Sequence, residues 1–148
     1  MGSIPTPGIR SGPTRRLMPP TAAFPAGTVL WVALGGAIGS ALRFGVSELF
    51  RRAPALAGLP WATLLVNVAG SLLIGWFLRW SAAAETTPQL RAFVAIGICG
   101  GFTTFSAFAA ENLAILQAGH PLRAALHAAA SVALSVGAVF VGYALARP

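Results

Sequence analysis

The residues most able to do chemistry lie in the middle of the third apolar stretch of the chain. This stretch contains the run Gly100-Gly101-Phe102-Thr103-Thr104. Glycine is unfavourable inside a helix and threonine competes for backbone hydrogen bonds, so the run predicts a broken helix. Broken helices at membrane depth persist where the freed carbonyls line a cavity or bind an ion. Carbonyl oxygens are hard donors that suit a small hard cation such as sodium.

Two phenylalanines follow directly after this run. Phe105 and Phe108 are three residues apart and therefore share one face of a helix. Such a pair ordinarily packs in a core. An aromatic ring also has a positive edge, however, and ring edges attract a desolvated anion without a strong hydrogen bond that would trap it. Both interpretations of the pair stay open on spacing alone.

Polar residues recur at four-residue steps in two other apolar segments: Thr63, Asn67 and Ser71 in the second, and His127, Ser131 and Ser135 in the fourth. Residues four apart lie on one helix face, so each set forms a polar stripe. One interpretation is hydrogen bonding between helices, which is common in membrane bundles. The other is a line of donors for a permeating anion. The presence of two stripes favours a shared path.

A single arginine, Arg43, interrupts the first apolar segment among many small residues. The small residues allow close helix packing. Arg43 either extends its side chain to the membrane interface or lends positive potential to an anion vestibule, and both can hold together. The lone cysteine, Cys99, excludes an intrachain disulfide, and we expect it to be a small buried hydrophobe.

The composition indicates that the outer surface meets lipid. The chain is 56% hydrophobic and only 9% charged, whereas a soluble domain has roughly 25% charged residues. All ten basic residues are arginines and the net charge is +7. These arginines sit at the ends of apolar runs, which is typical of membrane boundaries, so no nucleic-acid partner is expected.

Four apolar segments are long enough to span the hydrocarbon core, which takes about 20 helical residues. They cover residues 28–50, 61–80, 88–117 and 122–146. The predicted fold class is an all-α membrane protein with four transmembrane helices, the third broken mid-membrane. Short loops make neighbouring helices antiparallel, which places both termini on one side. Residues 1–26 are rich in Pro, Gly and Arg and are expected to be a disordered tail, with the channel domain over 27–148.

Orientation is set by the distribution of arginines between the two sides. Outside the tail, three arginines fall on each side: Arg79, Arg91 and Arg147 against Arg51, Arg52 and Arg123. Only Arg10, Arg15 and Arg16 of the tail shift the balance. A helical core without a charge bias can insert either way up, which makes an antiparallel homodimer plausible.

The sequence resembles the CrcB/Fluc family of fluoride channels. The resemblance covers residues 28–146 and rests on three runs: Gly35 to Phe44 ending in Arg43-Phe44, Thr63 to Gly70 containing Asn67, and Gly100 to Phe108. It implies a bacterial inner-membrane protein that exports fluoride passively from the cytoplasm. It further implies an antiparallel, dual-topology homodimer with two pores and a central structural sodium ion.

The resemblance also assigns roles to residues. It implies that the backbone carbonyls of Gly100 and Thr103 bind the sodium ion and that Phe105 and Phe108 line the fluoride pores. The pore asparagine is Asn67, and the remaining path residues are Thr63, Ser106, Ser131, Ser135 and Arg43. Glu111 matches an acidic residue nearer the pore mouth. His127 stands where some members have a tyrosine.

Two other classes of protein, an exporter and an enzyme, fit the sequence less well than a channel does. A small dual-topology multidrug exporter needs a membrane-embedded carboxylate for proton exchange, and the first segment has no central acid; Glu48 is near its end and Glu111 is late in the third segment. An enzyme needs a nucleophile with a base or a metal cluster. His120, His127 and Cys99 have no evident activating partner in sequence, so no catalytic residue is expected.

Overall fold

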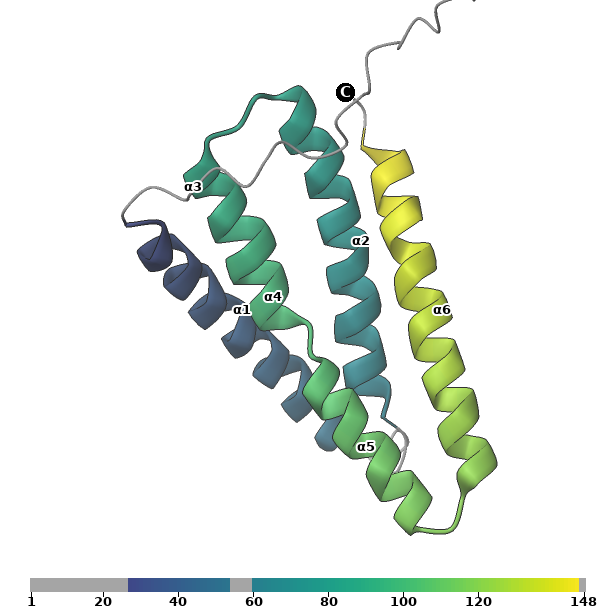
Figure 1. Cartoon of the computed structure of the whole chain (residues 1–148). Helices are drawn as coiled ribbons and strands as arrows, with labels where there is room; N and C mark the ends of the chain where they lie inside the picture. The colour runs from purple at the N-terminus through teal and green to yellow at the C-terminus, as the bar shows by residue number, and fades with distance from the viewer. Residues whose placement is uncertain (1–26, 54–59, 147–148) are drawn as a thin grey trace, which may run out of the picture.

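The computed structural model describes residues 27–53 and 60–146, and they form four long helical regions (Figure 1). The first is α1 (Thr28–Arg51) and the second is α2 (Trp61–Ala83). The third consists of α3 (Pro88–Arg91), the π-helix η2 (Ala92–Cys99), α4 (Gly100–Phe102) and α5 (Phe105–Gln117), and the fourth is α6 (Pro121–Leu145). The prediction of four helical spans is confirmed. The predicted tail lies outside the described residues.

The four regions are suited to a bilayer in both length and surface. They are 24, 23, 30 and 25 residues long, and each is apolar enough to cross a membrane. Large apolar side chains such as Val29, Leu122 and Phe140 are more than 70% exposed. In water such a surface would be strongly unfavourable, whereas in lipid it is the expected exterior. The chain is therefore a multi-pass membrane protein.

The bundle consists mainly of two close helix pairs. Helix α1 packs along η2 and α4, and α2 packs along α6. Glycines allow both pairs to approach at backbone distance, because a Cβ atom at Gly39 would overlap the Ile98 carbonyl and one at Gly142 would overlap the Leu72 carbonyl. Packing of small residues is a main source of helix association in membranes, where the hydrophobic effect between helices is absent.

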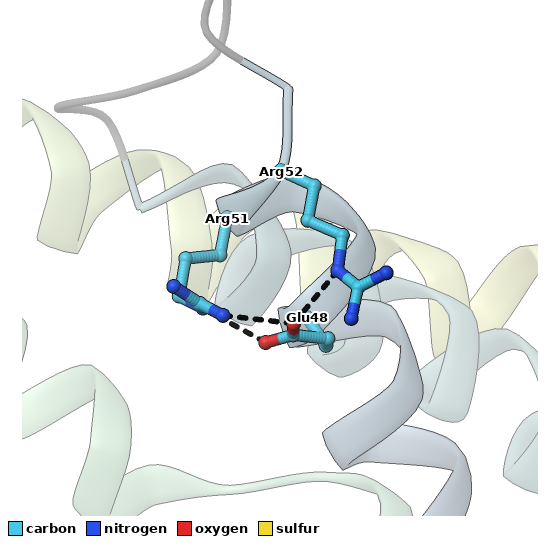
Figure 2. A network of polar contacts seen from close by, with 3 residues as sticks. All are labelled: Glu48, Arg51 and Arg52. Atoms are coloured by element: carbon cyan, nitrogen blue, oxygen red, sulfur yellow. Dashed lines mark hydrogen bonds and ion pairs between the residues drawn. The ribbon is translucent and has the colours of Figure 1, made fainter.

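Successive helical regions run in opposite directions, as the short loops predict. Figure 1 shows the start of α1 and the end of α6 at the same end of the bundle. At the opposite end, α1 closes with Glu48, Arg51 and Arg52 (Figure 2). Nε of Arg51 and Nε of Arg52 each lie 2.8 Å from a carboxylate oxygen of Glu48. Two arginines on this side therefore share one negative charge. Their own positive charges also complement the partial negative charge at the helix C-terminus.

The second helix ends later than predicted. The sequence indicates a loop from Ser81, but α2 continues to Ala83, because alanine is the best helix former and nothing in this run stops the helix. Arg91 then closes the turn by donating from Nη2 to the Ser81 carbonyl at 2.8 Å. The third region also contains a feature that the sequence did not predict, the widened π-helical turns of η2, which often accompany functional sites.

Candidate functional site: a broken helix beside a polar cavity

The third helical region is interrupted at Thr103 and Thr104. Thr103 has φ −80° and ψ 157°, and Thr104 has φ −152° and ψ 119°, so both residues are extended between α4 and α5. Helix α5 begins directly afterwards, with the Thr104 side chain accepting a hydrogen bond from the Ala107 amide at 3.2 Å. This is an N-cap, and threonine is one of the residues that favour that position. The predicted interruption is present.

Asn67 of α2 supports the interruption from the side. Its Nδ2 donates to the Thr104 carbonyl at 3.1 Å, and its Oδ1 accepts from the Thr104 amide at 2.8 Å. One side-chain amide thus satisfies both polar groups of a residue that left the helix. Unsatisfied backbone groups are costly in a bilayer, so this pair of bonds stabilises the extended conformation there.

The carbonyls of Gly100 and Thr103 are among those that lose their usual helical donors at this point. In a continuous helix, the Gly100 carbonyl would accept from the Thr104 amide and the Thr103 carbonyl from the Ala107 amide. The structure instead directs the first amide to Asn67 and the second to the Thr104 hydroxyl. The carbonyls released in this way belong to the two residues from which a sodium site is expected.

The surroundings of these carbonyls suit a hard cation. Gly100 is exposed, and no atom lies within 4 Å of where its Cβ would be. The Thr103 hydroxyl donates to the Cys99 carbonyl at 2.8 Å, and the Thr103 backbone oxygen has lost its usual amide donor. Within the described ranges, no cluster of three His, Cys, Asp or Glu residues offers another metal site. The ligands that Gly100 and Thr103 offer at this place are backbone oxygens, which are hard donors.

Arg43 is placed against the same interruption. Its Nε donates to the Gly101 carbonyl at 3.0 Å, and the Ser40 hydroxyl lies 3.5 Å from the same oxygen. The guanidinium thus binds the C-terminal end of α4, where the helix dipole is negative. Arg43 is half-buried at the broken helix, and its charge lies on the side of the break that faces α1.

A cavity of about 410 Å³ lies on the other side of the break, between α2, the third helical region and α6. It brings together many of the residues that the sequence singled out. The predicted residues that line it are Asn67, Ser71, Gly100, Thr103, Thr104, Phe105, Phe108, Ser131 and Ser135. Residues from both polar stripes therefore line one cavity, although at least sixty positions separate them in the chain.

The two phenylalanines form the aromatic side of this cavity. Their ring centroids are 5.3 Å apart at an interplanar angle of 47°. Phe105 is 77% exposed, so its ring extends beyond the subunit, whereas Phe108 is half-buried. The Phe108 ring also contacts the imidazole of His127, with centroids 5.5 Å apart. Phe108 therefore joins the cavity to a polar group on α6.

Some predicted path residues lie outside the cavity lining. The buried Thr63 donates its hydroxyl to Oε1 of Glu111. The Ser106 hydroxyl is 3.1 Å from that of Thr104 and is exposed. Arg43 is at the opposite side of the break. The structure therefore gathers two residues of each stripe and the aromatic pair around the cavity, whereas Thr63, Ser106, Arg43 and His127 lie outside its lining.

Asn112 is a residue that the sequence reasoning missed. Its Nδ2 donates to the Phe108 carbonyl at 2.9 Å and lies 3.1 Å from Nδ1 of His127. The signal was available, because Asn112 follows Phe108 by four residues and therefore shares its helix face. Its polar partner on α6, by contrast, depends on how the helices pack.

Comparison with known proteins decides the family. The family model described as "CrcB-like protein, Camphor Resistance (CrcB)" matches residues 30–143. The chain belongs to the CrcB family. The match includes the broken helix, the aromatic pair and both polar stripes, and it ends near the last residue of α6.

Several curated relatives within the CrcB family are similar over nearly their full length. A protein of Hyphomonas neptunium is 48% identical over 120 residues, which is 80% of this chain and 94% of the relative. A protein of Thermus thermophilus is 47% identical over 116 residues, which is 78% of this chain and 92% of the relative. A protein of Rhizobium meliloti is 44% identical over 122 residues, which is 80% of this chain and 95% of the relative. Each of these relatives is named "Fluoride-specific ion channel FluC".

Proposed function

We propose that this protein is a fluoride channel of a bacterial cell membrane, through which fluoride leaves the cytoplasm passively. The observation that carries the proposal is the 44–48% identity to proteins named as fluoride-specific channels over about four fifths of the chain. The broken helix, the cavity with its polar side chains and the aromatic pair supply the physical means. A proton-coupled multidrug exporter is not favoured by any of these relatives.

The cavity suits a small, strongly hydrated anion. Fluoride gives up its water only where donors replace it at close range. The hydroxyls of Ser71, Ser131 and Ser135 line the cavity and offer such donors, while the ring edges of Phe105 and Phe108 provide weak positive potential between them. Weak, repeated sites allow an ion both to enter and to leave.

The active form in this proposal is an antiparallel dual-topology homodimer with two pores and one structural sodium ion. The exposure of Phe105 and of Gly100 supports a second copy, because both groups face outward from a single subunit. Carbonyls of Gly100 and Thr103 from two copies would hold the ion between the two broken helices. The near balance of arginines between the two sides supports insertion in both orientations.

The proposal is tested by fluoride efflux from liposomes that contain only this protein, followed with a fluoride electrode. Rapid efflux of fluoride, with chloride retained under the same conditions, is the expected result. Protein-free liposomes prepared at the same lipid composition measure the background leak. Efflux no faster than this background would overturn the proposal, and equal efflux of chloride would overturn its selectivity.

Phe108→Ile is expected to abolish fluoride efflux in the same assay while the protein remains assembled. The substitution removes the ring that joins the cavity to α6 but keeps a large apolar side chain. Phe140→Ile is the matched control, since Phe140 is 71% exposed on α6 and does not line the cavity. Normal efflux through Phe108→Ile would contradict the pore assignment.

A further inference from the structure

Four buried side-chain atoms within the described residues have no hydrogen-bond partner: Glu111 Oε2, Asn112 Oδ1, His127 Nε2 and Ser131 Oγ. They come from only two helices, α5 and α6, and from the region beside Phe108. A buried polar atom without a partner costs free energy, so such atoms mark places where water or a ligand binds. Ser131 lines the main cavity, so the cluster is a candidate extension of that cavity.

Hydrogen-bond chemistry determines which tautomer of His127 is present. Asn112 Nδ2 donates to the Phe108 carbonyl, which can only accept, and this fixes the orientation of the amide. The same NH2 group lies 3.1 Å from His127 Nδ1, so Nδ1 must accept. A neutral imidazole that accepts at Nδ1 carries its proton at Nε2. His127 therefore presents a buried N–H donor that lacks a protein acceptor.

The position of His127 connects two spaces. Its ring contacts Phe108, which lines the main cavity, and Ser131, one turn further along α6, lines that cavity too. His127 itself lines a second cavity of about 240 Å³, together with Trp61, Leu64 and Arg123. An anion that passed Phe108 would therefore meet the His127 region before reaching the space that Arg123 borders.

Protonation of His127 is incompatible with the observed hydrogen bond. An imidazolium has donors on both nitrogens, so Nδ1 could no longer accept from Asn112. The amide would have to turn and present Oδ1, which is buried without a partner, and its bond to the Phe108 carbonyl would be lost. The ring contact with Phe108 would at the same time become a cation–π contact.

Two other charged groups face this site. Glu111, next to Asn112 on α5, has one carboxylate oxygen bound by Thr63 of α2 and the other without a partner. Arg123, one turn before His127 on α6, borders the second cavity. From α2, which packs against both helices, the nearby polar groups Thr63 and Asn67 are neutral. Titration of Glu111 must therefore be separated from that of His127 in any test.

We propose that His127 is a proton-sensitive anion donor in the ion path, held in its Nε2–H tautomer by Asn112 and coupled through Asn112 to Phe108. The proposal rests on the proposed channel function. The neutral imidazole binds a passing fluoride weakly, whereas an imidazolium forms a charge-assisted hydrogen bond that is roughly twice as strong. An anion held more tightly leaves more slowly, so acidification slows conduction.

The first test is nitrogen NMR of the full chain in bilayers, with histidine labelled by ¹⁵N. The sequence has two histidines, so His120→Gln leaves His127 as the single reporter. We expect a neutral ring protonated at Nε2 at pH 7.5 and an imidazolium signal that grows towards pH 5.5. A ring protonated at Nδ1, or no titration over this range, would overturn the proposal.

The second test is fluoride efflux at equal pH inside and outside the liposomes, corrected with protein-free liposomes at each pH. Wild type and His120→Gln are expected to slow by about fivefold between pH 7.5 and 5.5, and His127→Gln is expected to lose this dependence. A pH dependence that persists in His127→Gln and disappears in Glu111→Gln would assign the effect to Glu111 and overturn the proposal. Efflux at background level for every protein and pH would instead overturn the channel function, whatever tautomer NMR reports.

Discussion

Among single residues, Asn67 has the most consequential contacts. Its amide binds both the N–H and the C=O of Thr104. The side chain thus supplies the two hydrogen bonds that a neighbouring β-strand would give to one extended residue. One hydrogen of its NH2 group is not used in these bonds, so Asn67 can contribute to an ion path both directly and through the groups that it positions. The residue therefore joins the stability of the break to the function of the cavity.

Asn67→Ala is expected to destabilise the protein by about 1–4 kcal/mol, because it leaves two backbone groups of Thr104 without partners in an apolar environment. Thermal unfolding in detergent should show a lower midpoint, and fluoride efflux should fall with it. For the unfolding midpoint alone, Ser71→Ala is the control, since Ser71 lies one turn away on α2 and lines the same cavity. Equal unfolding midpoints for wild type and Asn67→Ala would show that these two bonds contribute little.

Among the structural elements, the interrupted third region depends on diverted hydrogen bonds and on close helix packing. Asn67 and the Thr104 hydroxyl take the amides that would otherwise bind the Gly100 and Thr103 carbonyls. Arg43 binds the carbonyl of Gly101 from α1. Three different helical regions thus contribute to one short extended segment, which explains how it persists at membrane depth.

Removal of sodium is expected to abolish fluoride efflux and to weaken the proposed dimer. The released carbonyls of Gly100 and Thr103 suit a small cation, and a bulky organic cation cannot be bound by them in the same way. The measurement is efflux and gel-filtration mass after exchange into buffer whose only cation is N-methylglucamine. Readdition of sodium is the control and should restore both. Unchanged assembly and activity after stringent exchange would argue against the sodium site.

Gly142→Ala tests the packing of α2 against α6. A Cβ at this position would overlap the Leu72 carbonyl, and overpacking of this kind costs about 1–3 kcal/mol. Gly137→Ala, on the same helix, is the matched control because no atom lies within 4 Å of its Cβ position. Unfolding midpoints in detergent should fall for the first variant only. A similar change for both would mean that helix propensity, and not contact, dominates.

For the whole molecule, the main question is orientation in the membrane. By the arginine count of the sequence, the two sides carry equal numbers of arginines outside the tail. The positive-inside bias of the helical core is therefore small. An antiparallel dimer requires this balance, since the chain must insert in both orientations.

Dual topology predicts that His120→Cys, in a Cys99→Ala background, will be labelled from both sides of the membrane. His120 is exposed in the turn before α6, and Cys99 is the only native cysteine. A membrane-impermeant maleimide applied to intact cells should modify about half of the molecules, and permeabilisation should expose the remainder. Labelling of all or of none in intact cells would establish a single orientation.

Signals within single segments of the chain were enough to predict the number of spans, their approximate limits, the position of the break and the family. These properties are local, because apolar length sets a span and the Gly100 to Thr104 run sets the interruption. The resemblance, over residues 28–146, includes all the residues that the family model matches, 30–143. Local signals were less accurate at the end of α2, where alanines extend the helix beyond Ser81.

Which side chains meet became known only from the packing of the helices. Asn67 and Thr104 are 37 positions apart, and Arg43 and Gly101 are 58 apart, so their bonds depend on the contact of separate helices. The same holds for Asn112 and His127, which lie on either side of a turn. Periodicity places a residue on a face of its own helix. The partner of that face is set by glycine contacts between helices, which no pattern within one segment specifies.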